Sequence, residues 1–324
     1  MKLTIAIDAM GCDSGPSVVV DGAFQASLVY PDVNIVLVGQ EDILVKELAK
    51  FKESPQISIL HAPEVITPDE VPTSAIRQKK NSSIVVGLKA VKEGQASGFV
   101  SAGSTGALLT GATVIVGRKK GIERPALGAP IPTKTGYTLL IDSGANMDCK
   151  PSYLAQFGQI GSEYMEKALG VKNPRVGLIN VGTENEKGNA AAKEAYNLLT
   201  DCGINFIGNI EGREIPTGVV DVAVCDGFVG NIVLKFMEGL AQTMMGTIKE
   251  ELMSTKLSKL GALLAKGAFG NVKKRFDYRE VGGAPFLGLN SLVVKAHGSS
   301  DALAMKNAII KCIIFEKEGA TRHE

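Results

Sequence analysis

Short apolar runs alternate along the chain with longer segments in which apolar and polar residues recur at helical spacing. The apolar runs are rich in β-branched residues and end at glycine or a polar residue, which is typical of buried strands. We expect strands at residues 3–7, 35–38, 57–60, 98–101, 138–141, 176–180, 206–207, 219–224 and 292–295. Helices are expected at residues 16–28, 41–50, 83–93, 107–116, 152–169, 190–199, 230–251 and 300–317. The proline-bearing segments 62–72 and 118–132 are expected to be irregular connections.

This alternation predicts an α/β fold in which a mostly parallel sheet carries helices on both faces. We interpret residues 1–324 as a single domain, within which residues 240–275 form a helical hairpin. Polar residues stand at or just after the ends of several predicted strands: Asp8, Ser101, Asp142, Asn180, Asp226 and His297. Because the carboxyl ends of parallel strands share one edge of a sheet, these residues are expected to converge there.

The segment 175–189, RVGLINVGTENEKGN, is a strong candidate for a ligand-binding loop. A buried strand is followed by a polar loop with a glycine at each end, and then by a helix that Asn189 is expected to cap. The free N–H groups and partial positive charge of a helix start favour an anion. Since Lys187 stands just before this helix, we interpret the loop as one wall of an oxyanion or phosphate site.

Two other glycine-bearing loops repeat this arrangement, SAGSTG at residues 101–106 and DGFVGN at residues 226–231. The hydroxyls of Ser104 and Thr105 can donate to an anion, and the Asn231 amide can orient a carbonyl or a phosphate. A plain strand-to-helix turn explains the first loop equally well, and Asn231 could instead only cap its own helix. The glycine spacing in the first loop does not fit the dinucleotide-binding fingerprint.

His297 follows the last predicted strand in the sequence KAHGSSD, where an imidazole could protonate a leaving group or hold phosphate. A lone histidine is more often structural, and a neighbouring serine could simply cap the next helix. Cys225 is interpreted as a buried, inert thiol rather than an acyl-accepting nucleophile, because no adjacent residue would lower its pKa. The sequence has no HExxH motif and no paired cysteines, so we expect no metal site.

Composition narrows the class of protein. The net charge of +1 does not indicate nucleic-acid binding through bulk charge, and 45% hydrophobic with 21% charged residues favours a folded globular chain. The five cysteines lack CxxC spacing, as expected in a reducing compartment. The N-terminal residues do not follow a signal-peptide pattern, and we find no apolar run of about 20 residues that could span a bilayer. These features predict a cytoplasmic protein.

Residues 245–268 carry an apolar stripe at helical spacing, formed by Met253, Leu257, Leu260 and Leu264. Such a stripe could touch a membrane surface. It could equally pack against a second subunit or against the body of the protein. The sequence leaves both interpretations open.

Together these motifs resemble the bacterial phosphate acyltransferase family, the PlsX family, over nearly the whole chain. The resemblance rests on residues 7–11 (IDAMG), 77–83 (RQKKNSS), 101–107 (SAGSTGA), 124–126 (RPA), 144–146 (GAN), 182–189, 226–231, 282–284 and 295–301. The chain departs from the family at Cys12, where a second glycine is usual.

The resemblance implies transfer of a long acyl chain from acyl carrier protein to inorganic phosphate, giving an acyl phosphate for phospholipid synthesis. It also implies a three-layer αβα fold similar to phosphate acetyltransferases and isocitrate-type dehydrogenases, and a homodimer. The family is expected to associate loosely with the membrane, through the lipid surface or the membrane glycerol-phosphate acyltransferase. No cofactor and no nucleic-acid partner are expected.

Phosphate is already a nucleophile at neutral pH, so this chemistry needs donors for the anion and the oxyanion rather than a strong base. We predict catalytic roles for Lys187, Asn231 and His297. The predicted substrate-binding residues are Asp8, Gly103, Ser104, Thr105, Gly106, Asn146, Gly182, Thr183, Asp226, Gly227 and Gly230. The carboxylates of Asp8 and Asp226 are expected to orient donors, because two free carboxylates would repel phosphate.

Two other functions remain open at this stage. One is an NAD(P)-dependent dehydrogenase on a related scaffold, although the dinucleotide fingerprint is missing. The other is a non-catalytic scaffold that recruits lipid enzymes. A titration with NAD(P) and a turnover assay would distinguish them.

Overall fold

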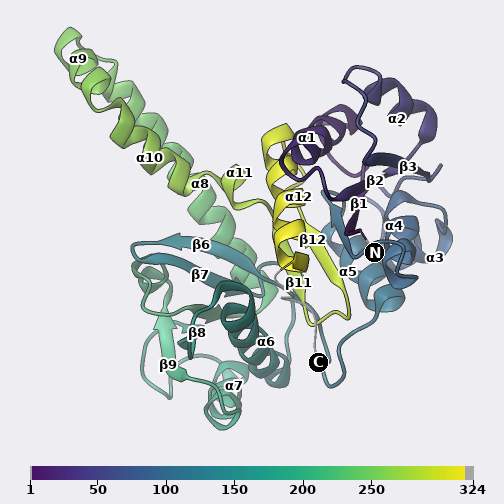
Figure 1. Cartoon of the computed structure of the whole chain (residues 1–324). Helices are drawn as coiled ribbons and strands as arrows, with labels where there is room; N and C mark the ends of the chain where they lie inside the picture. Colours follow the sequence, from purple (N-terminus) through teal and green to yellow (C-terminus); the bar gives the residue numbers. More distant parts are fainter. Residues whose placement is uncertain (1, 318–324) are drawn as a thin grey trace.

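The structure is a computed structural model that describes residues 2–317, apart from the side chains of residues 273, 278 and 281. In this part of the chain the strands form two sheets (Figure 1). The first sheet has the strand order β3 (Ile57–His61), β2 (Asn34–Gly39), β1 (Thr4–Asp8), β4 (Gly98–Ser101), β12 (Leu292–Lys295), β11 (Ala284–Leu287) and β5 (Ala126–Leu127). Strands β3 to β12 run parallel, whereas β11 is antiparallel to both of its neighbours.

The second sheet is also mostly parallel. Its order is β6 (Ala129–Thr133), β7 (Gly136–Ile141), β10 (Val222–Val224), β8 (Val176–Asn180) and β9 (Phe206–Glu211). Only β6, at the edge, runs antiparallel to its neighbour among these described strands. Gly128 joins β5 to β6, so the chain passes directly from the edge of one sheet to the edge of the other.

Helices cover both faces of each sheet, which confirms the three-layer α/β class. One face of the first sheet packs on α1 (Pro16–Val29) and α12 (Ala302–Lys317), and the other on α4 (Ser83–Lys92) and α5 (Thr105–Gly111). The remaining helices are α2 (Glu41–Leu48), α3 (Pro72–Gln78), α6 (Pro151–Leu169), α7 (Ala190–Asp201), α8 (Gly227–Leu252), α9 (Lys256–Leu264), α10 (Lys266–Phe276) and α11 (Tyr278–Val281), with a π-helical turn at Ala112–Val116 and a 3₁₀ helix at Gly212–Thr217.

The two-residue period of a strand explains how one sheet holds two cores. Ile5 and Ile7 on β1 belong to the core beneath α1 and α12, whereas Ala6 between them belongs to the core beneath α4. In the second sheet, α6 packs on one face and the first turns of α8 pack on the other. The carboxyl ends of the parallel strands are therefore bordered by helices that begin there.

An arm projects from this body (Figure 1). It consists of the second half of α8, of α9 at the tip, and of α10, which returns along α8 and contacts it. This confirms a protruding helical hairpin, although the apolar segment 245–268 is not one helix. Helix α8 ends at Leu252, and the Thr255 hydroxyl caps α9 by accepting the Ser258 N–H.

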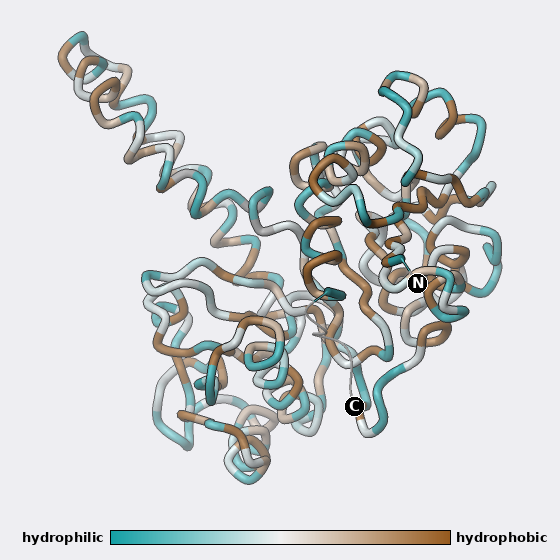
Figure 2. The backbone as a smooth tube through the Cα atoms, viewed as in Figure 1, coloured by the Kyte–Doolittle hydropathy of each residue, from teal (hydrophilic) through white to brown (hydrophobic). Residues whose placement is uncertain are grey.

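The hydropathy of the arm differs from that of the body. In the body the strands are mostly apolar, whereas the arm mixes apolar and polar positions (Figure 2). Its four predicted stripe residues are all exposed: Met253, Leu257, Leu260 and Leu264. Among the described helices, none combines the length and the apolar character needed to cross a bilayer.

Local sequence signals located most of the elements. Helix α1 begins at Pro16, and Asn189 caps α7 by accepting the Ala192 N–H at 2.8 Å, as predicted. The prediction of an irregular segment 118–132 was wrong in part, because β5 and β6 lie within it. The closing helix begins at Ala302 rather than residue 300, since Asp301 Oδ1 accepts the Ala304 N–H.

Candidate active site

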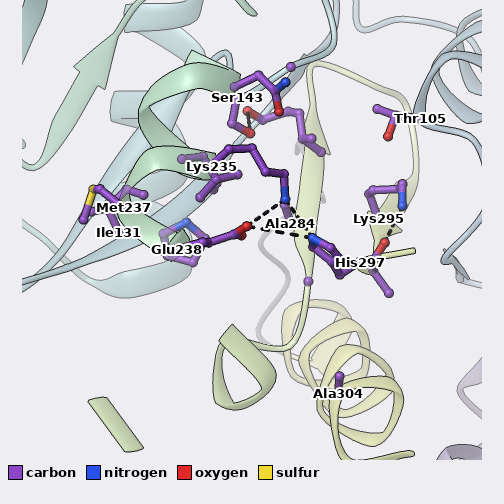
Figure 3. Close-up of a pocket in the computed structure, with 18 of the residues that line it drawn as sticks. Thr105, Ile131, Ser143, Lys235, Met237, Glu238, Ala284, Lys295, His297 and Ala304 are labelled. Atoms are coloured by element: carbon purple, nitrogen blue, oxygen red, sulfur yellow. Dashed lines mark hydrogen bonds and ion pairs between the residues drawn. The ribbon is translucent and has the colours of Figure 1, made fainter. Parts of the chain in front are cut away.

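A cavity of about 330 Å³ lies where the two sheets meet. Its walls come from β6, α8, the loop after β7, the ends of β11 and β12, and the start of α12. Figure 3 shows Lys295 and Thr105 on one side, Lys235, Glu238 and His297 near the centre, and Ile131 with Met237 on the other side. Ligand pockets of proteins occupy about 300–1,000 Å³, so the cavity is large enough for a substrate.

The centre of the cavity holds a cluster of charged and polar side chains from two distant segments. Lys235 on α8 donates to His297 Nε2 at 2.7 Å and to Glu238 Oε2 at 2.7 Å. On the other side of the ring, His297 Nδ1 lies 2.8 Å from Ser299 Oγ and 3.3 Å from the Ser299 backbone nitrogen. Burial and then the Lys235 charge lower the pKa of His297, so the ring is neutral at pH 7.

Lys295 brings a second cation to the cavity. As the last residue of β12 it is partly buried, and its ammonium donates to the carbonyls of Ala102, at 3.1 Å, and Ala296. Burial lowers the pKa of Lys295 to about 8, although the carboxylates of Asp13 and Asp8 act in the opposite direction. The ammonium form therefore predominates at pH 7.

Asn231 also lines the cavity, as predicted for a site residue. It stands on the first turn of α8, and a Cβ on Gly144 would lie 3.4 Å from the Asn231 Cβ. The helix is instead capped by Asp226, whose Oδ1 accepts the Val229 N–H at 2.8 Å. The simple capping role for Asn231 is therefore wrong, and its side chain lies beside Gly144 in the cavity lining.

The buried carboxylate of Asp142 fixes the loop that carries Gly144. It accepts the N–H groups of Leu127, Gly144, Ala145 and Asn146 at 2.6–3.2 Å, and the Asn146 side-chain amide at 2.8 Å. Burial raises the pKa of Asp142, and these hydrogen bonds oppose the increase. Asn146 thus supports the loop from behind, and the described lining of the cavity does not include it.

Two predicted glycines allow α8 to approach this loop. A Cβ on Gly230 would lie 1.9 Å from the Asp142 carbonyl oxygen, and one on Gly227 would lie 2.7 Å from the Asn146 carbonyl oxygen. The Gly227 N–H donates to that same Asn146 carbonyl at 2.7 Å. Both glycines are therefore required for packing that brings Asn231 to the cavity.

Asp8 organises the neighbouring edge of the first sheet. Its Oδ2 accepts the Ser101 hydroxyl at 2.7 Å, and the Ser101 oxygen accepts the Gly103 N–H at 3.0 Å. A Cβ on Gly11 would lie 2.7 Å from Gly103 Cα, so the loops after β1 and β4 pack against each other. These hydrogen bonds hold the ends of the neighbouring strands β1 and β4 together, and an orienting role of Asp8 toward a substrate stays a prediction.

The remaining residues of the SAGSTG loop have different positions. Thr105 lines the cavity, whereas Ser104 caps α5 by accepting the Ala107 N–H at 3.4 Å. Gly106 packs on the start of α3, where an added Cβ would lie 2.7 Å from Pro72 Cγ. The loop therefore contributes one hydroxyl to the described cavity wall.

Lys187 does not belong to the described cavity wall, and neither do Gly182 and Thr183. The Lys187 ammonium lies 3.9 Å from Glu184 in an exposed loop. The loop with Lys187 follows β8, and the loop with Asp226 follows β10. Because β8 and β10 pair in parallel, both loops leave the same carboxyl edge of the second sheet. The structure thus separates Lys187 from the group formed by Asn231 and His297.

Cys225 is buried, as predicted, and does not line the cavity. Burial raises the pKa of its thiol well above the usual value, and the charges of Asp142 and Asp226 act in the same direction. Because the thiolate is the nucleophilic form, this environment disfavours a role in acyl transfer.

Three charged residues of the cavity were missed by sequence reasoning: Lys235, Glu238 and Lys295. Lys235 stands four residues after Asn231, on the same face of α8, and Glu238 follows one turn later. The helical spacing from Asn231 was the available signal for these two. Lys295 resembled an ordinary strand end, and its surroundings come from loops distant in the sequence, such as the one that carries Ala102.

This arrangement suits a ligand with an anionic head and an apolar body. Two ammonium groups and an amide line the part of the cavity away from Ile131 and Met237, where they can hold an anion and a developing oxyanion. The other end is formed by apolar side chains, including Ile131, Leu234 and Met237. A neutral His297 fixes Lys235 without adding negative charge.

The amino-acid sequence matches a known protein family over nearly the whole chain. Residues 3–321 match the family described as "Fatty acid synthesis protein". A phosphate acyltransferase of Clostridium beijerinckii is 51% identical over 316 residues, which cover 97% of this chain and 95% of that protein.

Solved structures with the same fold include two kinds of enzyme. A phosphotransacetylase from Streptococcus pyogenes aligns with a TM-score of 0.64 at 18% identity, over 97% of this chain and 94% of its own. A 4-hydroxythreonine-4-phosphate dehydrogenase from Burkholderia phymatum aligns with a TM-score of 0.52 at 15% identity, over 100% of both chains. At these identities the likeness shows the fold alone.

Proposed function

Because the chain belongs to the phosphate acyltransferase family, we propose that it transfers a long acyl group from acyl carrier protein to inorganic phosphate. The chain is an acyltransferase by this membership. The carrier thioester as donor and the direct attack of phosphate are our proposals. The observation that carries them is a single cavity whose one end is cationic and whose other end is apolar.

In the proposed reaction a phosphate oxygen attacks the thioester carbonyl carbon. The carbon–sulfur bond then breaks, and the carrier leaves as a thiolate that needs little or no proton donation. The ammonium groups of Lys235 and Lys295 offset the charge of the bound phosphate. The Asn231 amide donates to the carbonyl oxygen as negative charge develops on it.

The other polar residues position these groups. Glu238 and the neutral His297 hold the Lys235 ammonium in the cavity, at 2.7 Å each. Holding the reacting groups in place lowers the entropic part of the barrier, which suits a reaction whose nucleophile needs no activation.

We retain Lys187 as a further anion ligand in this proposal. Its loop leaves the carboxyl edge of the sheet next to the strand that precedes Asp226. The side chain is long and exposed, so it can reach toward a ligand at that edge. Substitution of Lys187, described in the Discussion, tests this part separately from the cavity.

The proposal also includes a homodimer, a cytoplasmic location and contact of the hairpin with a membrane surface or the membrane glycerol-phosphate acyltransferase. The exposed leucines at the tip of the arm support this contact, since Leu257 and Leu264 are 81% and 82% exposed.

The test is an assay of the purified protein with palmitoyl-acyl carrier protein, with and without inorganic phosphate. We expect acyl phosphate and free carrier only when phosphate is present. The dehydrogenase alternative shares the fold and predicts instead that NAD(P) binds in a titration. Binding of the nucleotide without any acyl phosphate would reject our proposal.

A further inference from the structure

The cavity continues beyond its charged end along an apolar wall. Helix α8 contributes Leu234, Met237 and Ala241 to this wall, and the facing strand β6 contributes Ile131 among other residues. Figure 3 shows Ile131 and Met237 together, on the side away from Lys295. A cleft of this size with an apolar wall beside a few polar groups is typical of ligand-binding pockets.

The length of this wall can be worked out from the helix. Asn231 and Ala241 are ten residues apart on α8 and both line the cavity. At a rise of 1.5 Å per residue they are separated by about 15 Å along the helix axis. The hydrocarbon core of a bilayer is about 30 Å thick and two acyl chains deep, so one lipid chain spans about 15 Å.

The chemistry of the wall favours hydrocarbon over a polar ligand. Glu238 shares the α8 face, but its carboxylate accepts the Lys235 ammonium at 2.7 Å and points toward the polar end (Figure 3). Beyond it, Ala241 and Phe276 mark the end of the described lining, where α8 and α10 meet at the base of the arm. A small residue at 241 leaves this end of the groove open.

We propose that the acyl chain of the substrate lies in the groove between α8 and β6, and that the small side chain at Ala241 is what lets a long chain extend past this position. This inference rests on the proposed acyl transfer. It adds the binding subsite of the chain and a residue that determines chain-length specificity. The thioester carbon lies at the Asn231 end, and the methyl end of the chain points toward Phe276.

The experiment compares Ala241→Phe with Gln242→Phe as a matched control. Gln242 is the next residue on α8 and is exposed, and the described lining of the cavity does not include it. The same aromatic side chain is therefore added inside the groove in one variant and outside it in the other. The rate of acyl phosphate formation is measured with palmitoyl- and octanoyl-acyl carrier protein. Ala241→Leu provides a smaller obstruction in case the phenylalanine variant does not fold.

We expect Ala241→Phe to lower kcat/KM for the palmitoyl substrate by ~tenfold or more while the octanoyl substrate changes by less than about threefold. Ala241→Leu should give a smaller shift in the same direction, and Gln242→Phe should leave the ratio of the two substrates unchanged. An unchanged ratio in both Ala241 variants would overturn the inference. Absence of acyl phosphate from the wild-type protein with either substrate would reject the proposed function itself, which is a different outcome.

Discussion

Lys295 should give the enzyme an alkaline limit that can be measured. Its pKa of about 8 results mainly from burial at the end of β12. If the ammonium form holds phosphate, the active fraction is about 90% at pH 7 and about 10% at pH 9. The value of kcat/KM for phosphate should therefore fall about tenfold between these two pH values. Phosphate itself becomes more anionic over this range, so the substrate cannot account for a fall.

The substitution Lys295→Met removes the charge while keeping a long apolar side chain. Loss of one hydrogen bond to a charged group costs about 1.5–3 kcal/mol, which corresponds to a decrease of about 10- to 150-fold in kcat/KM at pH 7. The variant should also lose the decline between pH 7 and 9, because the titrating group is gone. The assay is initial-rate release of carrier at several phosphate concentrations, corrected for thioester hydrolysis without enzyme.

Lys311 provides the matched control. Burial lowers its pKa to about 8 as well, but it lies on α12, outside the described cavity lining, with its ammonium donating to the Gly283 carbonyl. Lys311→Met should therefore keep the alkaline limit of the wild-type protein. The reasoning is refuted if wild-type kcat/KM stays flat from pH 7 to 9, or if Lys311→Met abolishes the limit.

Other predictions follow from the site and the arm. Asp142→Asn should lower the free energy of unfolding by about 2–6 kcal/mol, because the new NH₂ group cannot accept the two N–H donors that now bond to Oδ2. The measurement is urea unfolding. A free energy of unfolding within about 1 kcal/mol of wild type, roughly the mean effect of a point mutation, would contradict this prediction. Lys187→Ala should lower kcat/KM for phosphate at least ~tenfold. The Tm should stay unchanged, because the Lys187 side chain is exposed. Activity within a fewfold of wild type would show that Lys187 does not belong to the site. The double variant Leu257→Glu, Leu260→Glu should co-sediment less with phosphatidylethanolamine–phosphatidylglycerol vesicles, because each exposed leucine contributes about 1.5–3 kcal/mol when it is buried in lipid. If the variant instead dissociates a dimer in analytical ultracentrifugation, the apolar stripe packs between subunits.

The sequence predicted most helices and strands because their signals are local. Pro16 begins α1, Asn189 caps α7, and the continuous apolar run of Ile5, Ala6 and Ile7 fits a strand buried on both faces. These signals depend on neighbours within one turn or one pleat, so a single sequence contains them.

Strand β6 escaped prediction for a physical reason. Its prolines at 130 and 132 indicate an irregular segment, but they alternate with buried residues, and β6 lies at the edge of its sheet. At an edge a missing N–H breaks no ladder, so proline is tolerated there. Only the position of the segment at the edge of the sheet distinguishes a proline-bearing strand from an irregular connection, and the sequence does not show that position.

The candidate site was predictable only in part. Asn231 and His297 were chosen because they follow strands, and the structure brings both to the cavity. Lys235 and Lys295 join them because α8 beside the second sheet and the end of β12 in the first sheet line the same cavity, although they are distant in the sequence. Lys187 had the stronger local signal, and its loop lies outside the described cavity wall. Their roles in catalysis remain predictions that the variants above address.

The most direct test of the account is the intact mass of the protein after incubation with palmitoyl-acyl carrier protein in phosphate-free buffer, followed by addition of phosphate. Direct attack by bound phosphate predicts no change in the mass of the protein and no release of carrier at first, and then release together with palmitoyl phosphate once phosphate is added. A protein that gains the mass of a palmitoyl group before phosphate is added, or carrier released without phosphate, would contradict the central claim.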